Sequence, residues 1–270
     1  MANFTYAPLI REMVWSYSRA NSFGMCKYKW YMKYICRKKG QQEMFFSGYG
    51  SFIHNILERF YKGELAQGQL LTTYLTEFHT SVKGKPPNMK IFQKYFEDGK
   101  RYFQNFKPLP FNVVAIEENV ELEIDDLKFT GIADWIGELS EEEGGGLIVI
   151  DNKSRTLKPR SGKKKPTKTD IELDEYFRQL YLYALAVQKK YGRTVRKLGF
   201  NCFRNANPLI IEDFDPNKAD EAVAWFKEQV AYIADETEFS PDLDYFKCTN
   251  LCEMNGQCEF FRSAERRHWR

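Results

Sequence analysis

Two carboxylates and one lysine stand near the ends of two apolar, strand-like runs of the sequence. Asp134 lies within the run at residues 132–136, and Asp151 and Lys153 directly follow the run at residues 147–150. Side chains alternate along a strand, so Asp151 and Lys153 share a face. The glycines at residues 144–146 permit a reversal that pairs the two runs antiparallel. This pairing would bring Asp134 to the same spot.

Such a cluster has two interpretations. Two carboxylates held together repel, and each favours protonation of the other. A divalent cation with oxygen ligands removes that conflict, which indicates a Mg²⁺ or Mn²⁺ site held by Asp134 and Asp151. The alternative is a buried Asp–Lys ion pair that stabilises a hairpin without chemistry. Glu117, at the end of another strand-like run, would either add a third carboxylate or stay solvated.

Two predicted helices carry further polar groups. His54 lies beside the apolar face of a helix predicted at residues 47–62, where a lone histidine is more often a packed core residue than a ligand. Its role therefore stays open on this pattern alone. Gln179 and Tyr183 are i, i+4 neighbours on a helix predicted at residues 174–190, so both can reach one point beside the sheet.

The cysteines form a separate pattern. Three of the six are spaced C-x3-C-x5-C, and a closed all-thiolate site needs a fourth. Such sites hold zinc or an iron–sulfur cluster, and the cluster is favoured because zinc usually uses paired C-x2-C spacings. Four unrelated buried thiols are the plain alternative. The predicted ligands are Cys26, Cys248, Cys252 and Cys258, with Cys36 as the rival for the fourth place and Cys202 as a spare.

A basic segment follows Lys153 at residues 154–170. It contains seven lysines and arginines with two prolines and almost no apolar residues, which is typical of a mobile loop. One interpretation is a solvated linker; the other is a strap that contacts DNA through charge, without reading its sequence. The predicted contacts are Arg155, Lys158, Arg160, Lys163, Lys164 and Lys165.

The elements that must position these groups follow a simple order. Helices come first, three strands in a meander follow, and then a helix, a strand and a helix, which predicts an α/β fold with a mixed sheet covered by helices. We expect a helical region at residues 1–110, a core at residues 111–240 and a cysteine segment at residues 241–270 that packs with the N-terminal region. Within the helical region, one amphipathic helix is expected in the aromatic and basic segment up to residue 36.

Composition narrows the class of protein. The chain is 43% hydrophobic and 29% charged, which argues against disordered and fibrous classes. No apolar run reaches membrane-spanning length and no secretory leader is visible, so we expect a cytoplasmic protein with no membrane partner. The net charge is only +3, so any affinity for nucleic acid must come from local basic clusters.

In this order the motifs resemble the PD-(D/E)XK nuclease superfamily. More narrowly, they are similar to its RecB-like, AddB-type branch with a four-cysteine iron–sulfur cluster, which includes CRISPR-associated and viral exonucleases. The resemblance covers residues 18–261. It is carried by Cys26-Lys-Tyr-Lys-Trp-Tyr, Gly50-x-x-x-His54, Gly131-Ile-Ala-Asp134, Asp151-Asn-Lys153, Gln179-x-x-x-Tyr183 and the final cysteines.

The resemblance implies more than the residues do alone. It implies a restriction-endonuclease-like core and a metal-dependent deoxyribonuclease, an exonuclease on single-stranded DNA or DNA ends, with a structural 4Fe-4S cluster. His54 and the backbone carbonyl of Asn152 become ligands of Mg²⁺ or Mn²⁺, Lys153 a catalytic residue, and Gln179 and Tyr183 active-site residues. Partners in a recombination, CRISPR or phage replication complex and a homo-oligomer are compatible with it.

A second class of function stays open at this stage. A nuclease fold can serve as a catalytically silent DNA-binding module, or as a structural subunit of a repair or recombination complex closed by zinc. The sequence also leaves RNA open as a substrate.

Overall fold

A five-stranded mixed sheet organises residues 5–261, the part of the chain that the computed structural model describes. Its strands lie side by side in chain order: β1 (Asn112–Ile124), β2 (Leu127–Glu138), β3 (Leu147–Lys153), β4 (Val195–Cys202) and β5 (Leu209–Asp213). All neighbours pair antiparallel except β3 and β4, which are parallel. A parallel pair requires a long crossover, and α7 (Lys168–Tyr191) supplies it. The predicted α/β class with a mixed sheet is confirmed.

Two hairpins build the part of the sheet that carries the candidate residues. The reversal between β2 and β3 passes through Gly144, Gly145 and Gly146, all with positive φ, which confirms the predicted turn. The β1–β2 hairpin turns at Asp125, with φ 53°. The expectation that a strand-like run ends at Glu117 was wrong. The backbone continues as one strand through Glu117, although that residue has φ 50°.

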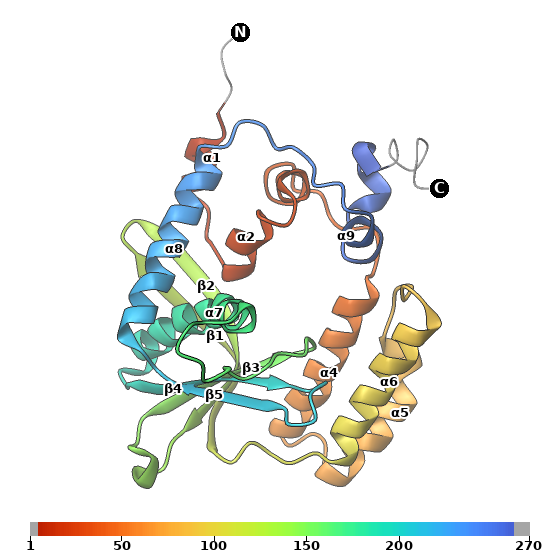
Figure 1. Cartoon of the computed structure of the whole chain (residues 1–270), viewed down its shortest axis with the longest axis vertical. Coiled ribbons are helices and arrows are strands. Elements are labelled where there is room, and N and C mark those ends of the chain that lie inside the picture. Colours follow the sequence, from red (N-terminus) through yellow and green to blue (C-terminus); the bar gives the residue numbers. More distant parts are fainter. Residues whose placement is uncertain (1–4, 262–270) are drawn as a thin grey trace.

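The other helices lie in two groups around the sheet (Figure 1). One group contains α4, α5 and α6, which stand together to the right of the sheet in this view. On the opposite side α8 runs beside the sheet, and α2 lies between it and α4. Their bounds are α1 (Ala7–Arg11), α2 (Tyr17–Ser22), α3 (Lys27–Trp30), α4 (Phe45–Tyr61), α5 (Leu70–Ser81), α6 (Met89–Gln104), α8 (Pro216–Ala234) and α9 (Tyr245–Asn250).

The single helix expected before residue 36 is divided instead. The side chains of Ser16 and Cys26 each accept a backbone N–H, so α2 and α3 begin separately. A π-helical turn, Tyr31–Ile35, then follows α3 directly. Short 3-10 turns lie at Gln67–Gln69, Glu141–Glu143 and Asn255–Gln257.

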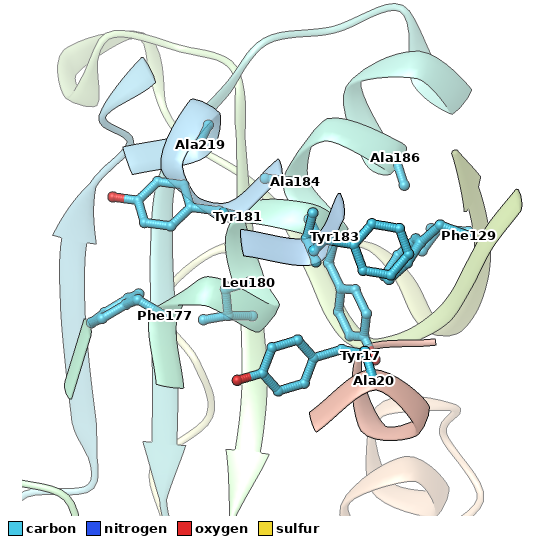
Figure 2. Packing of buried hydrophobic residues seen from close by; sticks show 14 of the residues in the cluster. Tyr17, Ala20, Phe129, Phe177, Leu180, Tyr181, Tyr183, Ala184, Ala186 and Ala219 are labelled. Carbon is cyan, nitrogen blue, oxygen red and sulfur yellow. The ribbon is translucent and has the colours of Figure 1, made fainter. Parts of the chain in front are cut away.

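The main core lies between α7 and one face of the sheet. Figure 2 shows Phe177, Leu180 and Tyr183 of α7 among buried side chains from β2, α2 and α8. Small residues such as Ala184 let neighbouring elements approach α7 closely. Each fully buried large side chain contributes about 1.5–3 kcal/mol to folding, so this face fixes α7 against the sheet.

A second core joins α4, α5 and α6. Aromatic side chains dominate it, including Tyr49, Phe52 and Tyr74, all of them buried. At its end Tyr61 of α4 contacts Trp135 of β2, with ring centroids 6.0 Å apart, on the face of the sheet away from α7. These contacts hold α4, and the histidine it carries, against the strands. None of the helices within residues 5–261 has both the length and the apolar character needed to cross a bilayer.

Candidate active site

Three carboxylates lie in a row across β1, β2 and β3. Trp135 pairs with Ile150, and continuing this antiparallel register by one residue sets Asp134 opposite Asp151. The pairs on either side of Glu117 set that residue opposite Asp134 in the same way. Directly opposite residues project from the same face of a sheet. The sequence therefore predicted two members of this row and left the third, Glu117, undecided.

His54 reaches the row from α4. Its Nε2 lies 2.9 Å from the backbone carbonyl oxygen of Asn152, and its Nδ1 lies 3.4 Å from Asp134 Oδ2. The same Asp134 oxygen accepts the backbone N–H of Asn152 at 2.7 Å. The geometry thus brings together all four residues predicted as metal ligands, which are His54, Asp134, Asp151 and Asn152.

The electrostatics of the row favour a positive ion. Burial and the neighbouring charge of Asp151 raise the pKa of Asp134 well above its usual range. Burial and the charge of Asp134 raise the pKa of Glu117 to about 7. Asp151 is almost fully buried, and its Oδ2 is paired with the Lys153 ammonium at 2.7 Å. A buried carboxylate needs such a compensating charge, but one lysine cannot balance both Asp151 and Asp134.

The donor set suits Mg²⁺ or Mn²⁺. One ligand atom each from His54, Glu117 and Asp134 lie within 4.8 Å of one another. Carboxylate and carbonyl oxygens with one imidazole are ligands that these ions accept. Asp151 lies opposite Asp134 on the next strand, so the residues present fit a divalent cation.

Lys153 is held between β3 and α7. Its ammonium donates to Gln179 Oε1 at 3.0 Å, and Gln179 Nε2 donates to the Tyr183 hydroxyl at 3.1 Å. Burial alone would lower the pKa of Lys153, but the charge of Asp151 outweighs it and raises that pKa, so the ammonium stays charged. Gly131 makes room for this arrangement, because a Cβ there would lie 2.4 Å from a ring carbon of Tyr183.

Two residues that the sequence did not single out support the segment after Asp151. Asn201 on β4 donates to the side chain of Asn152 at 2.7 Å and to the hydroxyl of Tyr102 at 2.8 Å. Arg204 donates to the backbone oxygen of Ser154 at 3.3 Å. Asn201 lies within a predicted strand and Arg204 directly follows it, but only the fold places them beside the candidate site.

The four predicted cluster cysteines gather between the two ends of the chain. Cys248, Cys252 and Cys258 lie in or against one small apolar cluster. Burial raises the pKa of Cys248 to about 11, and the charges of Cys252, Cys26 and Cys258 act in the same direction. The sulfur of Cys26 accepts the backbone N–H of Asp242 at 3.5 Å, which ties the early cysteine to the late segment.

The four sulfurs do not form a compact group. Within the described residues, no three cysteine sulfurs lie within 4.8 Å of one another. A tetrahedral zinc site with Zn–S distances of about 2.3 Å draws its sulfurs to about 3.8 Å apart. Cys36 is exposed, and Cys202 is buried on β4, where it pairs with Lys153 in the sheet register.

The basic segment after Lys153 is anchored rather than free. Arg160 pairs with Asp174 at 2.5 Å and with Glu212 at 2.8 Å, and Arg155 pairs with Glu172 at 2.6 Å. This differs from the expectation of a mobile strap, because two of the six predicted DNA contacts already have acidic partners. The exposed lysines of the segment are Lys158, Lys163, Lys164, Lys165 and Lys168.

Comparison with known proteins covers most of the chain. Residues 14–259 match the family described as the PD-(D/E)XK nuclease superfamily. No curated protein matches the chain. Among solved structures, it is similar to a protein from Eubacterium rectale described as a putative exonuclease, with 14% sequence identity, coverage of 95% of this chain and 90% of that chain, and a TM-score of 0.49.

Proposed function

The chain belongs to the PD-(D/E)XK nuclease superfamily, and from this premise we propose that it is a divalent-metal-dependent deoxyribonuclease that hydrolyses phosphodiester bonds. One observation carries the proposal. Asp134 and Asp151 lie opposite each other on adjacent strands, with the Lys153 ammonium 2.7 Å from Asp151. Paired carboxylates beside a fixed cationic group suit the hydrolysis of an anionic ester.

Each candidate site residue has a distinct role in the proposed reaction. Asp134, Asp151, His54 and the carbonyl oxygen of Asn152 would hold Mg²⁺ or Mn²⁺. When bound, this ion lowers the pKa of a coordinated water and screens the charge of the phosphate. Lys153 orients the attacking water or neutralises negative charge that develops on the phosphate.

Gln179 and Tyr183 act through Lys153. The Gln179 amide accepts from the ammonium and donates to the tyrosine hydroxyl, so it limits the positions the ammonium can take. These hydrogen bonds fix the ammonium before substrate binds. Such preorganised charge is the condition for strong electrostatic stabilisation of a transition state.

The test is a cleavage assay with end-labelled DNA. Single-stranded and double-stranded substrates are incubated with the protein in Mn²⁺, in Mg²⁺ and in EDTA, and product lengths are followed with time. We expect ion-dependent cleavage that shortens DNA from its ends and prefers single strands. Cleavage that persists in EDTA, or none in either ion with a folded protein, would refute the proposal.

We further propose the RecB-like, AddB-type branch with a structural 4Fe-4S cluster on Cys26, Cys248, Cys252 and Cys258. The support is that the four cysteines gather from the early and late parts of the described chain. A crosslink over so long a loop would stabilise the fold by several kcal/mol, about as a long-range disulfide does.

The anionic partner is proposed to contact the exposed lysines after Lys153. The segment that carries these lysines begins directly after the candidate site, so a DNA strand bound at the site would pass near them. The proposed contacts are Lys158, Lys163, Lys164 and Lys165. Arg155 and Arg160 are less available because their acidic partners already neutralise them.

A catalytically silent DNA-binding module or a zinc-closed structural subunit is the competing proposal. No feature of the active site favours it. Burying Asp134 beside Asp151 raises the pKa of Asp134, and a module without catalysis has no use for so unfavourable a pair of carboxylates. The same cleavage assay separates it from the nuclease, and metal analysis of the purified protein separates zinc from iron.

A further inference from the structure

We propose that Glu117 is a direct ligand of the divalent cation, as a carboxylate contributed by β1 in addition to those of Asp134 and Asp151. The inference rests on the proposed metal-dependent function and adds a residue that the sequence motifs do not contain. It follows from position in the sheet, from the distances among donor atoms and from the local balance of charge.

The position is set by the register of β1 and β2. Glu117 lies opposite Asp134, as Asp151 does on the other side, so Asp134 is the middle member of the row. Glu117 also departs from extended backbone, with φ 50°, in the middle of a paired strand. Non-glycine residues adopt that region infrequently, and here it occurs at the one position of β1 that faces the other two carboxylates.

The distances favour a shared ligand shell. One donor atom each from His54, Glu117 and Asp134 lie within 4.8 Å of one another, a grouping from which one cation could draw all three as ligands. Asp151 is drawn instead toward Lys153, 2.7 Å away. The group of donor atoms at this spacing therefore contains Glu117 rather than the motif carboxylate on β3.

The balance of charge at the site also favours a divalent cation beside Glu117. Three ionised carboxylates and one ammonium leave two negative charges in this part of the molecule. One divalent cation neutralises them. Groups that face Glu117 from the packed elements include Asp134 of β2, His54 and Glu58 of α4, and Lys62 directly after α4; Lys62 is already paired with Glu58 at 2.5 Å. No basic side chain within the described residues is shown paired with Glu117.

The test is Mn²⁺ binding without DNA, measured by isothermal titration calorimetry and by the electron paramagnetic resonance signal of free Mn²⁺. The variants are Glu117→Gln, Glu117→Asp and the control Glu58→Gln. Removal of a ligand should weaken Mn²⁺ affinity at least tenfold in Glu117→Gln, while Glu58→Gln, which removes a nearby but paired charge, should change it less than threefold.

Glu117→Asp separates ligation from simple charge. It keeps the negative charge but withdraws the oxygen by one methylene, so a ligand role predicts weaker binding than wild type. Wild-type affinity in Glu117→Asp or in Glu117→Gln would overturn the inference. Folding is checked by melting in EDTA, where Glu117→Gln should melt at or above the wild-type temperature because a repulsive carboxylate has been removed.

The outcomes also separate this inference from the proposed function. Mn²⁺ binding that depends on Glu117 in a protein that cleaves no DNA would refute the nuclease alone. Ion-dependent cleavage together with unchanged Mn²⁺ affinity in Glu117→Gln would refute the role of Glu117 alone. A wild-type protein that binds no Mn²⁺ would refute both.

Discussion

The guanidinium of Arg204 lies 3.1 Å from the carboxylate of Asp98, and both side chains are almost fully buried. The pair joins α6 to the segment that follows β4, across 106 positions of the sequence. Arg204 also covers the ring of Tyr95 at 3.5 Å and donates to Ser154, next to Lys153. The helical region is thereby connected to the candidate site through one charged side chain.

Loss of this arginine should destabilise the whole fold. Arg204→Met leaves the Asp98 carboxylate buried with less compensation, so we expect the free energy of unfolding to fall by about 3–5 kcal/mol in urea titration. Arg101→Met is the matched control, because Arg101 contacts the same carboxylate at 2.9 Å from an exposed position. The control should lose about 1 kcal/mol or less. Equal losses in the two variants would contradict the special position of Arg204.

Lys153→Met should separate catalysis from metal binding. We expect the cleavage rate to fall by about 10²-fold or more, since a positioned cationic group is lost, while Mn²⁺ affinity is unchanged or higher because a positive charge has left the site. Lys197→Met on β4, which removes a lysine paired with Asp213, should cleave at the wild-type rate. A wild-type rate in Lys153→Met would show that the lysine has no part in the reaction.

The metal-free protein should lose stability as the pH rises. Glu117 has a folded-state pKa of about 7 against an ordinary 4.5, so the fold holds a proton that the unfolded chain releases. This contribution to stability is fully present below pH 4.5 and is lost as the pH rises to about 7. The raised pKa of Asp134 acts in the same direction.

Melting temperatures in EDTA between pH 4.5 and 8 measure this effect. The wild-type value should fall more steeply with pH than that of Glu117→Gln, and Mn²⁺ should abolish the difference because the ion takes the place of the proton. Identical slopes for the two proteins in EDTA would count against a proton on Glu117.

The cysteine ligands can be assigned by single substitutions. After anaerobic reconstitution with iron and sulfide, Cys26→Ser and Cys248→Ser should each lose the visible absorbance of a cluster and melt at lower temperature. Cys36→Ser is the control, because Cys36 is exposed. Retained absorbance in Cys26→Ser with loss in Cys36→Ser would make Cys36 the fourth ligand.

If the basic segment contacts DNA, its lysines should set how strongly DNA affinity depends on salt concentration. Replacing Lys163, Lys164 and Lys165 by alanine should weaken binding of single-stranded DNA and reduce the slope of log affinity against log salt by about 2, since each phosphate contact contributes about 0.7. Arg160→Ala should leave that slope unchanged and lower the melting temperature instead, because it breaks contacts to Asp174 and Glu212. The reverse pattern would assign DNA contact to the arginine.

The hairpin with Asp134 and Asp151 could be predicted because its information is local. Apolar alternation and three consecutive glycines fix the pairing of β2 and β3 within a short stretch. The helices were predictable for the same reason, although α2 and α3 were expected as one. The chain divides there because Cys26 caps a new helix start with its sulfur, a contact that no hydrophobic period reveals.

Other features depended on contacts between distant parts of the chain. Glu117 departs from the usual strand backbone, so alternation gave no reason to turn it toward Asp134. Asn201 and Arg204 act through partners about fifty to a hundred positions away. The basic segment looked free because one partner of Arg160, Glu212, lies on β5, a strand of only five residues that the sequence did not distinguish from a loop.

The chain order of the two candidate centres has a consequence for biosynthesis. The three carboxylates arise from consecutive hairpins, so they can meet as soon as residues 112–153 have left the ribosome. The cluster proposed on Cys26 cannot be complete until Cys258 has been synthesised, more than two hundred positions later. A nascent polypeptide stalled between these points would therefore carry its acidic row without the proposed link between its early and late segments.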